Sequence, residues 1–256
     1  MTQRLQGKVV VLTGAAGDIG QAVAEQMVAE GAKLLLVDRD APRLQALADR
    51  LGPQVRAEVA DVTQQADAER YAAAAVQHFG GIDVLLANAG IEGAVGAPVH
   101  ASDPEAFDRV MAVNVKGAYL ALRAVLPHLI ARGGGSVVLT SSVAGLVGVP
   151  GASAYVTSKH ALLGLARAAA LEYAPHHIRV NTVNPAPVRS RMMASIENGL
   201  APGAAEAAHQ AVLATIPSGR YAEPAEVARL MCFLASDEAS FCTGAAYLAD
   251  GGISAQ

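Results

Sequence analysis

A short glycine-rich segment near the N-terminus constrains the fold of this chain most strongly. It joins a mostly apolar run, Lys8–Leu12, to an alanine-rich stretch of helical composition, Gln21–Glu30. A short β-branched run of this kind is typical of a buried parallel strand. The joining segment, Thr13–Gly20, carries glycines at positions 14, 17 and 20. Strand, glycine turn and helix in this order can hold a pyrophosphate at a helix N-terminus, so the segment predicts a dinucleotide-binding unit.

The remainder of the chain repeats the alternation of strand and helix patterns. Further strands are predicted at Lys33–Val37, Val55–Val59, Val84–Ala87, Ser136–Thr140, Arg179–Val183 and Ala246–Ala249, and helices at Pro42–Leu51, Gln65–Phe79, Phe107–Ala131, Ala154–Tyr173 and Pro224–Leu234. Such alternation implies a parallel sheet with helices on both faces. We predict one α/β domain over residues 1–256, a Rossmann-type doubly wound parallel sheet of about seven strands. Ser102–Glu105 has the pattern of a capping box at the start of the fourth helix.

A serine, a tyrosine and a lysine form the pattern with the clearest chemistry. Tyr155 and Lys159 are spaced to share one face of a helix, and Ser142 precedes them in the chain. A phenol with a pKa of about 10 is a poor base at neutral pH, and a nearby ammonium lowers that pKa. A serine hydroxyl can donate a hydrogen bond to an oxygen on which charge develops. The trio predicts proton transfer to or from an alcohol oxygen.

An acidic residue follows the second predicted strand and bears on the choice of dinucleotide. Asp38 lies about twenty residues past the glycine segment, where a carboxylate can bind the adenosine ribose hydroxyls and repel a 2′-phosphate. Arg39 argues the other way, because a guanidinium can pair with that phosphate. Ala16 and Asp18 add no second cation in the glycine segment. We therefore predict NAD rather than NADP.

These features resemble the classical short-chain dehydrogenases/reductases over almost the whole chain. The matching motifs, in order, are Thr13-Gly14 with the glycines after it, Asp61-Val62, Asn88-Ala89-Gly90, Asn114, Ser142, Tyr155-x-x-x-Lys159, and Asn184-Pro185 followed by Val188 and Ser190. The resemblance implies a Rossmann fold and hydride transfer between a nicotinamide and an alcohol or ketone.

The resemblance also implies a role for each motif residue. Tyr155 is the general acid/base, and Ser142 orients the substrate and polarises its oxygen. Lys159 lowers the pKa of the phenol and binds the nicotinamide ribose, while Asn114 holds a water that links Lys159 to solvent. The implied cofactor-binding residues are Gly14, Asp18, Ile19, Gly20, Asp38, Asp61, Val62, Asn88, Tyr155, Lys159, Val188 and Ser190.

Two pairs among these residues contact opposite ends of the implied cofactor. Asp61 and Val62 correspond to adenine contacts, and Val188 and Ser190 to the pair that binds the nicotinamide carboxamide. Ala186 stands where the family usually has glycine, and a proline follows it. Proline restricts the residue before it to extended backbone, so this loop is expected to depart from the family's path.

The substrate is expected to be a neutral, hydrophobic secondary alcohol or its ketone. The segment Arg191–Ile216 is rich in methionine and other apolar residues, which suits an adaptable pocket wall, so we predict a substrate lid at about residues 190–216. An alternative is that these residues are simply the core of two short helices. Further apolar pocket positions are Val143, Ala144, Leu146, Val149 and Pro187, and Glu92 and His100 bring titratable groups near the mouth.

Composition bears on partners and location. A net charge of −4 without a basic run argues against nucleic acid and anionic membranes. Hydrophobic residues make up 52% and charged residues 16%, with a mean hydropathy of +0.32, which predicts apolar surface buried between subunits. A homo-oligomer is expected, a tetramer before a dimer. The polar N-terminus and two cysteines favour a cytoplasmic protein with both thiols reduced, and the histidines show no ligand spacing, so no catalytic metal is expected.

Three functions remain open from the sequence. The first is an NAD-dependent secondary-alcohol dehydrogenase, or a ketone reductase in the reverse direction. A 3-oxoacyl-carrier-protein reductase would need a basic patch for its acidic partner, for which Arg123 and Arg132 are candidates, and usually NADP. A dinucleotide-binding sensor without catalysis is disfavoured by the complete set of Asn114, Ser142, Tyr155 and Lys159. The sequence does not identify the alcohol, the stereochemistry of hydride delivery or the physiological direction.

Overall fold

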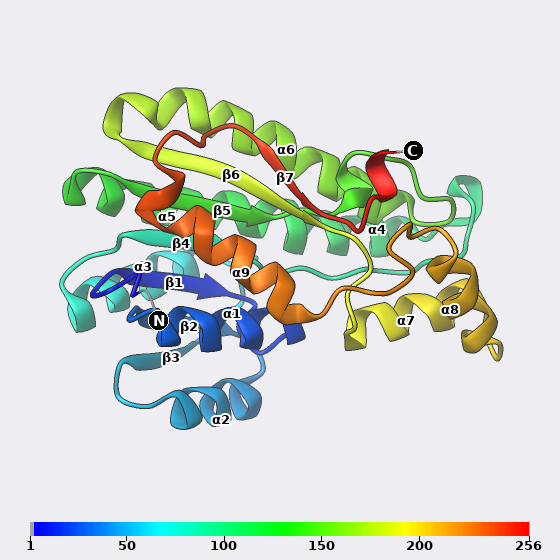
Figure 1. Cartoon of the computed structure of the whole chain (residues 1–256), viewed down its shortest axis with the longest axis horizontal. Coiled ribbons are helices and arrows are strands. Elements are labelled where there is room, and N and C mark those ends of the chain that lie inside the picture. Colours follow the sequence, from blue (N-terminus) through cyan, green and yellow to red (C-terminus); the bar gives the residue numbers. More distant parts are fainter. Residues whose placement is uncertain (1–2, 256) are drawn as a thin grey trace.

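The computed structural model describes residues 3–255, which form a seven-stranded, entirely parallel sheet (Figure 1). The strand order is β3-β2-β1-β4-β5-β6-β7. The strands are β1 (Val9–Thr13), β2 (Lys33–Asp38), β3 (Val55–Val59), β4 (Val84–Ala87), β5 (Gly135–Thr140), β6 (Ile178–Pro185) and β7 (Ala246–Ala249). The order reverses between β1 and β4, which is where a doubly wound sheet opens a crevice at its carboxyl edge. The predicted fold class is confirmed.

Helices cover both faces of the sheet. They are α1 (Asp18–Ala29), α2 (Ala41–Leu51), α3 (Gln65–Phe79), α4 (Pro104–Met111), α5 (Gly117–Arg132), α6 (Ser153–Tyr173), α7 (Arg191–Leu200), α8 (Ala205–Leu213) and α9 (Pro224–Ala235) within the described residues. In β1, Val10 and Leu12 pack with α1 and α9, whereas Val11 faces α3 and α5. Alternate side chains of one strand thus supply two separate cores, and this explains the continuous apolar runs in the sequence.

The fourth helix differs from its prediction in one respect. Instead of a single α-helix over Phe107–Ala131, α4 and α5 are joined by a π-helical turn at Ala112–Lys116. The turn contains the buried Asn114. Single π turns of this kind are rare and occur mainly at functional sites.

The start of the same helix corrects a second expectation. Asp103, not Ser102, is the N-cap, and its carboxylate accepts hydrogen bonds from the amides of Glu105 and Ala106. The Ser102 hydroxyl instead donates to the carbonyl of Val99, within the short 3₁₀ turn Val99–Ala101. A carboxylate one residue later therefore replaces the expected capping box.

The joined helix Pro104–Arg132 is also long and apolar enough to cross a membrane by length and composition. Half of its most apolar window is buried within the fold, and a core helix passes the same test, so this is weak evidence for a membrane span.

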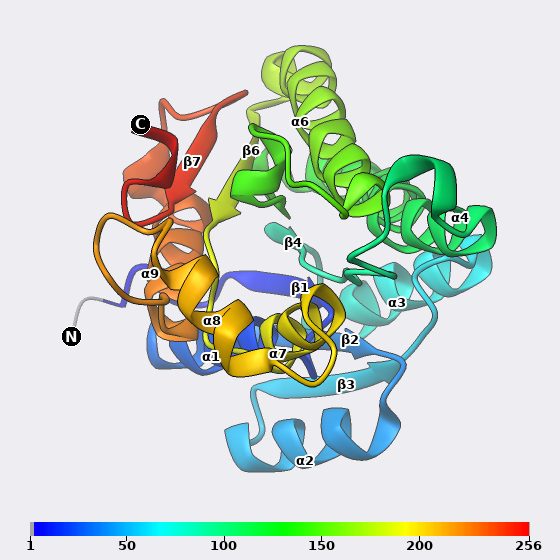
Figure 2. The same ribbon diagram turned by 90° about the vertical axis from the view of Figure 1, so that its right-hand side faces the viewer.

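Helices α7 and α8 lie beyond the carboxyl ends of the strands. Figure 2, the view from that end, shows them in front of the sheet, beside β6. They share a small apolar cluster of their own, centred on Met193, Ile216 and Tyr221. The predicted lid segment is thus folded as two short helices outside the two main cores.

Candidate active site

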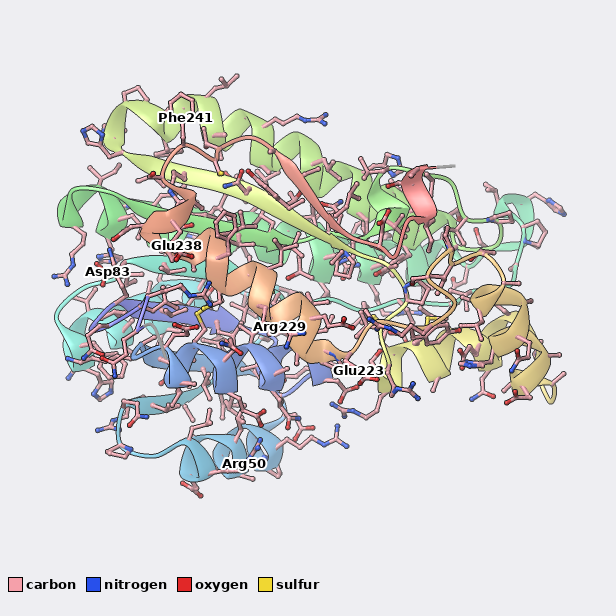
Figure 3. All side chains as sticks on the ribbon, viewed as in Figure 1. Arg50, Asp83, Glu223, Arg229, Glu238 and Phe241 are labelled. Carbon is pink, nitrogen blue, oxygen red and sulfur yellow. The ribbon has the colours of Figure 1, made fainter. Side chains whose placement is uncertain are left out.

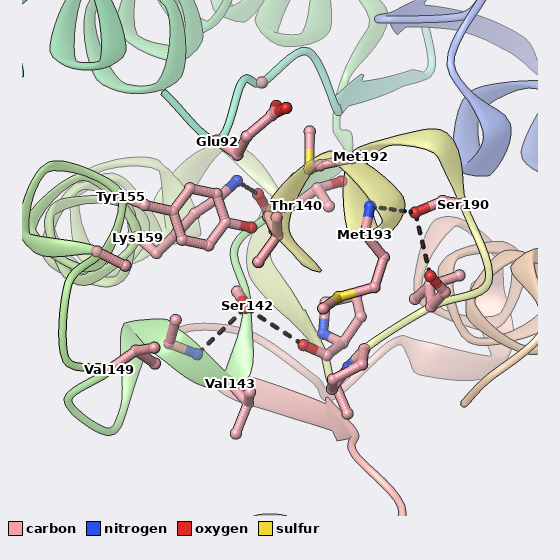
Figure 4. A pocket seen from close by; sticks show the side chains of 18 of the residues that line it. Glu92, Thr140, Ser142, Val143, Val149, Tyr155, Lys159, Ser190, Met192 and Met193 are labelled. Carbon is pink, nitrogen blue, oxygen red and sulfur yellow. Dashed lines mark hydrogen bonds between the residues drawn. The ribbon is translucent and has the colours of Figure 1, made fainter. Parts of the chain in front are cut away.

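The predicted site residues gather around one cavity of about 830 Å³ at the carboxyl edge of the sheet (Figure 4). Its wall includes the following predicted residues: Gly14, Asp18, Ile19, Gly20, Asp38, Asn88, Ser142, Tyr155, Lys159, Val188 and Ser190. Asp61, Val62 and Asn114 do not line it. One continuous cavity therefore runs from the glycine turn to Tyr155. The predicted dinucleotide site and the predicted proton-transfer site share this cavity.

The glycine turn is packed so closely that side chains at Gly14 and Gly20 would clash with neighbouring backbone. Gly14 has a φ of +67°, and a Cβ there would lie 2.7 Å from the Cα of Ala89. A Cβ on Gly20 would lie 2.2 Å from the carbonyl oxygen of Gly14. Gly17, the N-cap of α1, offers no side chain to the first amides of the helix. These unpaired amides and the helix dipole fit a pyrophosphate.

Asp38 is fixed at the end of β2 by two backbone amides. One carboxylate oxygen accepts from Ala16 N at 2.9 Å, and the other accepts from Asp40 N at 3.0 Å. Asp38 lines the cavity, whereas the side chain of Arg39 is exposed and lies outside the lining. A fixed carboxylate in this wall fits ribose hydroxyls, which donate hydrogen bonds.

Asn88 ties three neighbouring strands together next to the glycine turn. Its Nδ2 donates to the carbonyl of Gly14 at 3.1 Å, and its Oδ1 accepts from the Thr140 hydroxyl at 3.1 Å. Thr13 Oγ1 in turn accepts from the amides of Asn88 and Ala89, at 3.1 and 3.2 Å. These bonds fix the floor of the cavity where the sheet changes direction.

The three residues of the predicted proton-transfer site converge on the far part of the cavity. Lys159 Nζ donates to the carbonyl of Thr140 at 2.8 Å and lies 5.3 Å from the centre of the Tyr155 ring. The Ser142 hydroxyl accepts from Ala144 N at 3.2 Å, and Asn184 Nδ2 holds the Ser142 carbonyl at 2.9 Å. Figure 4 shows Ser142 and Tyr155 directed into the same space.

Burial controls the titration of this pair in the protein alone. Desolvation raises the pKa of Tyr155 to about 12; hydrogen bonding to Ser142 acts in the opposite direction, and the nearby Glu92 charge adds to the rise. Desolvation lowers the pKa of Lys159 to about 8. Burial therefore opposes ionisation of both side chains. The lowering of the tyrosine pKa by Lys159 together with a charged cofactor ring stays a prediction.

Asn114 is held rigidly by the π turn and by its own amide group. Its Nδ2 donates to the carbonyl of Ile91 at 2.9 Å and to Ser158 Oγ at 3.0 Å, while its Oδ1 accepts from Ile91 N at 2.8 Å. A Cβ on Gly90 would lie 3.4 Å from both Asn114 Oδ1 and Lys159 Nζ. Asn114 and Lys159 thus approach each other across Gly90, and the predicted water relay between them stays a prediction.

The loop after β6 places the two predicted carboxamide contacts in the cavity wall. Ser190 is the N-cap of α7: its hydroxyl accepts from Met193 N at 3.2 Å and donates to the carbonyl of Val188 at 3.1 Å. Ala186 donates its amide to Ala249, and Val188 pairs with Ala222 in an isolated parallel bridge. The proline-containing loop is therefore anchored on both sides.

Asp61 and Val62 follow β3, the edge strand that lies beside β2 and Asp38. The Asp61 carboxylate accepts from the amide and the hydroxyl of Thr63, at 2.9 and 2.8 Å. The Val62 side chain packs against Gly117, where an added Cβ would lie 2.9 Å from Val62 Cγ2. Their part in adenine binding stays a prediction.

Arg191 is a site residue that sequence reasoning missed. Its amide donates to Asp18 at 2.6 Å and its Nε to the same carboxylate at 2.9 Å, while Nη2 donates to the carbonyl of Ala16 at 3.0 Å. Arg191 begins α7, so this contact fastens the predicted lid to the glycine turn. No local pattern indicates a pair so distant in the chain.

The wall opposite the glycine turn is apolar. It is formed by Val95, Val143, Ala144, Val147, Val149, Pro150, Pro187, Met192, Met193, Ile196, Leu200 and Val212. The predicted pocket residue Leu146 and the titratable His100 lie outside this lining, but Glu92 lies within it. In the described part of the chain, no group of three or more His, Cys, Asp or Glu side chains could hold a metal ion, and both cysteines are free thiols.

Comparison with known proteins identifies the family of this chain. The sequence model of a family described as enoyl-(acyl carrier protein) reductase matches residues 14–254. The chain is 39% identical to 2-(S)-hydroxypropyl-CoM dehydrogenase 3 of Xanthobacter autotrophicus, covering all of both chains. It is 37% identical to levodione reductase of Leifsonia aquatica, covering 99% of this chain and 97% of the relative.

Two solved structures extend the comparison. The crystal structure of a levodione reductase superimposes with a TM-score of 0.96 at 36% identity, over 98% of this chain and 99% of the other. A 3-ketoacyl-(acyl-carrier-protein) reductase from Brucella melitensis, complexed with NADH, gives 0.90 at 32% identity, with the same coverage. The chain belongs to the classical short-chain dehydrogenase/reductase family and is an oxidoreductase that binds a nicotinamide dinucleotide.

Proposed function

We propose that this enzyme interconverts a neutral, hydrophobic secondary alcohol and its ketone, with NAD(H) as the hydride carrier. The observation that carries the proposal is a single cavity in which Tyr155 and Ser142 face a largely apolar wall. Such a wall favours alcohols without phosphate or carboxylate groups, because an anion would lose its hydration there without gaining a partner. The named activities of the relatives, a hydroxypropyl-CoM dehydrogenase and a levodione reductase, support alcohol–ketone chemistry.

The residues of the site divide the proton chemistry among them. A bound oxidised nicotinamide would supply the hydride acceptor for the carbinol carbon, and its positive charge would favour an ionised Tyr155. Tyr155 takes the hydroxyl proton as the ketone forms and returns a proton in the reverse direction. Ser142 holds the substrate oxygen by a hydrogen bond, and the Lys159 ammonium, fixed on Thr140, stabilises the phenolate.

The preference for NAD rests on the cavity wall at the end of β2. Asp38 contributes a carboxylate fixed by two amides, and a 2′-phosphate would meet this negative charge. The exposed Arg39 does not reach the lining. Ribose hydroxyls, by contrast, would donate hydrogen bonds to Asp38.

A 3-oxoacyl-carrier-protein reductase is the second candidate. It is supported by the similarity in fold to the solved Brucella reductase. Because that protein was crystallised with NADH, Asp38 alone does not separate the two functions. The two arginines considered for a carrier-protein surface are already engaged: Arg132 pairs with Asp83 at 2.9 Å, and Arg123 lies 4.0 Å from Glu69. This charge compensation favours the small alcohol.

We also infer a cytoplasmic homo-oligomer, a tetramer before a dimer. Leu171 on α6 is 81% exposed, and Phe241, between α9 and β7, protrudes fully from the surface (Figure 3). Tyr119 and Ile130 add apolar surface on α5. Large apolar side chains on packed helices are suited to burial between subunits.

The test is a set of initial rates at 340 nm with NAD and NADP against cyclic, aryl-alkyl and sugar-derived secondary alcohols. Turnover of hydrophobic alcohols with NAD is expected. Activity confined to NADPH and a 3-oxoacyl thioester would instead identify the carrier-protein reductase. Tight NADH binding without turnover of any substrate would favour the sensor.

A further inference from the structure

One polar side chain in the cavity wall stands apart from the others. The ionisable side chains of the lining include Asp18, which is paired with Arg191, and Asp38, which accepts two amides; Lys159 donates to a carbonyl. Glu92 also lines the cavity, yet within residues 3–255 its carboxylate has neither a hydrogen bond nor an ion pair. Its charge is near enough to raise the pKa of Tyr155. Figure 4 shows both side chains among those that line the pocket.

The backbone on both sides of Glu92 is held in place. Ile91, the residue before it, has its amide and its carbonyl both bonded to the side chain of Asn114, at 2.8 and 2.9 Å. Gly93, the residue after it, has a φ of +71°, and a Cβ there would lie 2.4 Å from Val110 Cγ2. The backbone before Glu92 is therefore fixed by Asn114, and the half-buried side chain starts from a fixed position in the wall.

A half-buried carboxylate without a protein donor keeps acceptor sites free, and a ligand that fills the cavity and displaces water must supply a donor to them. In this cavity the ligand must also fit the apolar wall formed by Val95, Val149 and Met192. A substrate anion would be repelled by Glu92. A substrate ammonium would meet the Lys159 ammonium near the reacting carbon. A neutral hydroxyl satisfies the carboxylate without either penalty.

We propose that Glu92 is a specificity residue that accepts a hydrogen bond from a second hydroxyl group, so that the preferred substrates are hydrophobic diols of which one carbinol is oxidised. This inference rests on the proposed alcohol–ketone function and narrows its substrate class. The reaction itself is unchanged: hydride leaves one carbinol carbon, its hydroxyl proton goes to Tyr155, and the second hydroxyl stays intact.

The experiment compares isomeric cyclohexanediols (1,2-, 1,3- and 1,4-) with cyclohexanol and 4-methylcyclohexanol in the native enzyme and in Glu92→Leu and Glu92→Gln. For the native enzyme, kcat/KM for the best diol should exceed that for 4-methylcyclohexanol by roughly 10- to 100-fold, the worth of a hydrogen bond to a charged group. Glu92→Leu should abolish this ratio; removing its charge also acts on Tyr155, but that effect is common to the diol and the monoalcohol and cancels in the ratio. Glu92→Gln, which retains an acceptor oxygen, should keep part of the ratio. Glu206→Leu on α8, an exposed glutamate outside the lining, is the matched control.

The outcomes separate this inference from the function on which it rests. Turnover of cyclohexanol with no diol preference, or an equal loss for both substrates in Glu92→Leu, would overturn the role of Glu92 and leave the proposed function standing. If no alcohol is oxidised, the proposed function fails. The inference is then judged by calorimetric titration of cyclohexane-1,4-diol and 4-methylcyclohexanol into native protein and Glu92→Leu, each with NAD. Equal affinities for the two compounds in the native protein would overturn the inference.

Discussion

The glycine-turn side of the cavity and its lid side are built on different principles. On the first side, Asp38, Asn88 and Asn114 are all fixed by hydrogen bonds to backbone or neighbouring side chains. On the second side, the wall consists of apolar side chains on α7 and α8, which rest on a small separate cluster. The main link between the two sides is the contact of Arg191 with Asp18 and Ala16. We therefore expect the first side to hold polar groups in a fixed geometry and the second to adapt to the size of the alcohol.

The largest expected effect lies on the fixed side. Tyr155→Phe removes the group that exchanges the substrate proton, and kcat should fall by about 10²- to 10⁴-fold, the usual contribution of general acid–base catalysis. NADH binding, measured by fluorescence titration, should change little, because the ring remains in place. Tyr173→Phe, at the other end of α6, is the control. Retention of activity in Tyr155→Phe would refute the mechanism.

A pair of matched truncations tests whether the two sides also differ in stability. Leu12→Ala removes a fully buried side chain from the main core and should lower the free energy of unfolding by about 2–5 kcal/mol. Ile196→Ala, at the edge of the lid cluster, should cost roughly 1 kcal/mol and shift the substrate preference towards larger alcohols. Urea denaturation and a size series of alcohols measure both. Equal destabilisation by the two changes would mean that the lid is an integral part of the core.

Lys159 should make the stability of the protein depend on pH, because burial lowers its pKa. Its pKa is lowered to about 8 in the folded protein, against 10.5 when unfolded, so between these values the unfolded chain binds the extra proton and stability rises with pH. Relative to Lys159→Met, native stability should therefore increase by roughly 2 kcal/mol from pH 8 to 10 and stay level below pH 7. Denaturation at a series of pH values measures the difference, with Lys33→Met at an exposed position as control. A difference independent of pH would show that burial does not perturb Lys159.

The last prediction concerns the choice of dinucleotide. Asp38→Ala removes the carboxylate that opposes a 2′-phosphate, and the ratio of kcat/KM for NAD over NADP should fall by roughly 10- to 100-fold. Asp40→Ala removes the N-cap of α2, outside the cavity wall, and should lower stability by about 1 kcal/mol without changing that ratio. An unchanged ratio in Asp38→Ala would show that another residue discriminates.

The two sides also differ in how far sequence predicts them. The seven strands were located within one or two residues, and the signal was clearest for the inner strands, which are buried on both faces and carry continuous apolar runs. The family motifs placed the glycine turn and the predicted proton-transfer residues in the cavity wall. The sequence could not predict the Asp18–Arg191 ion pair or the absence of a protein partner for Glu92 in the described residues. Both depend on which side chains meet in the folded chain. The effect of burial on Tyr155 was also beyond reach, because burial, which raises the pKa of the phenol, is a property of the folded cavity.

The π turn at Ala112–Lys116 suggests how this helix could be altered by deleting a single residue. A π turn holds about one residue more than an α turn, so it corresponds to a one-residue insertion that leaves the flanking helical segments in phase. Removing one residue there would give an uninterrupted helix from Pro104 to Arg132 whose two ends keep their packing faces. The orientation of the Asn114 side chain would change, and its two hydrogen bonds to the backbone of Ile91 would be lost. A single deletion, not a substitution, is thus the change that separates the architecture of this helix from its catalytic use.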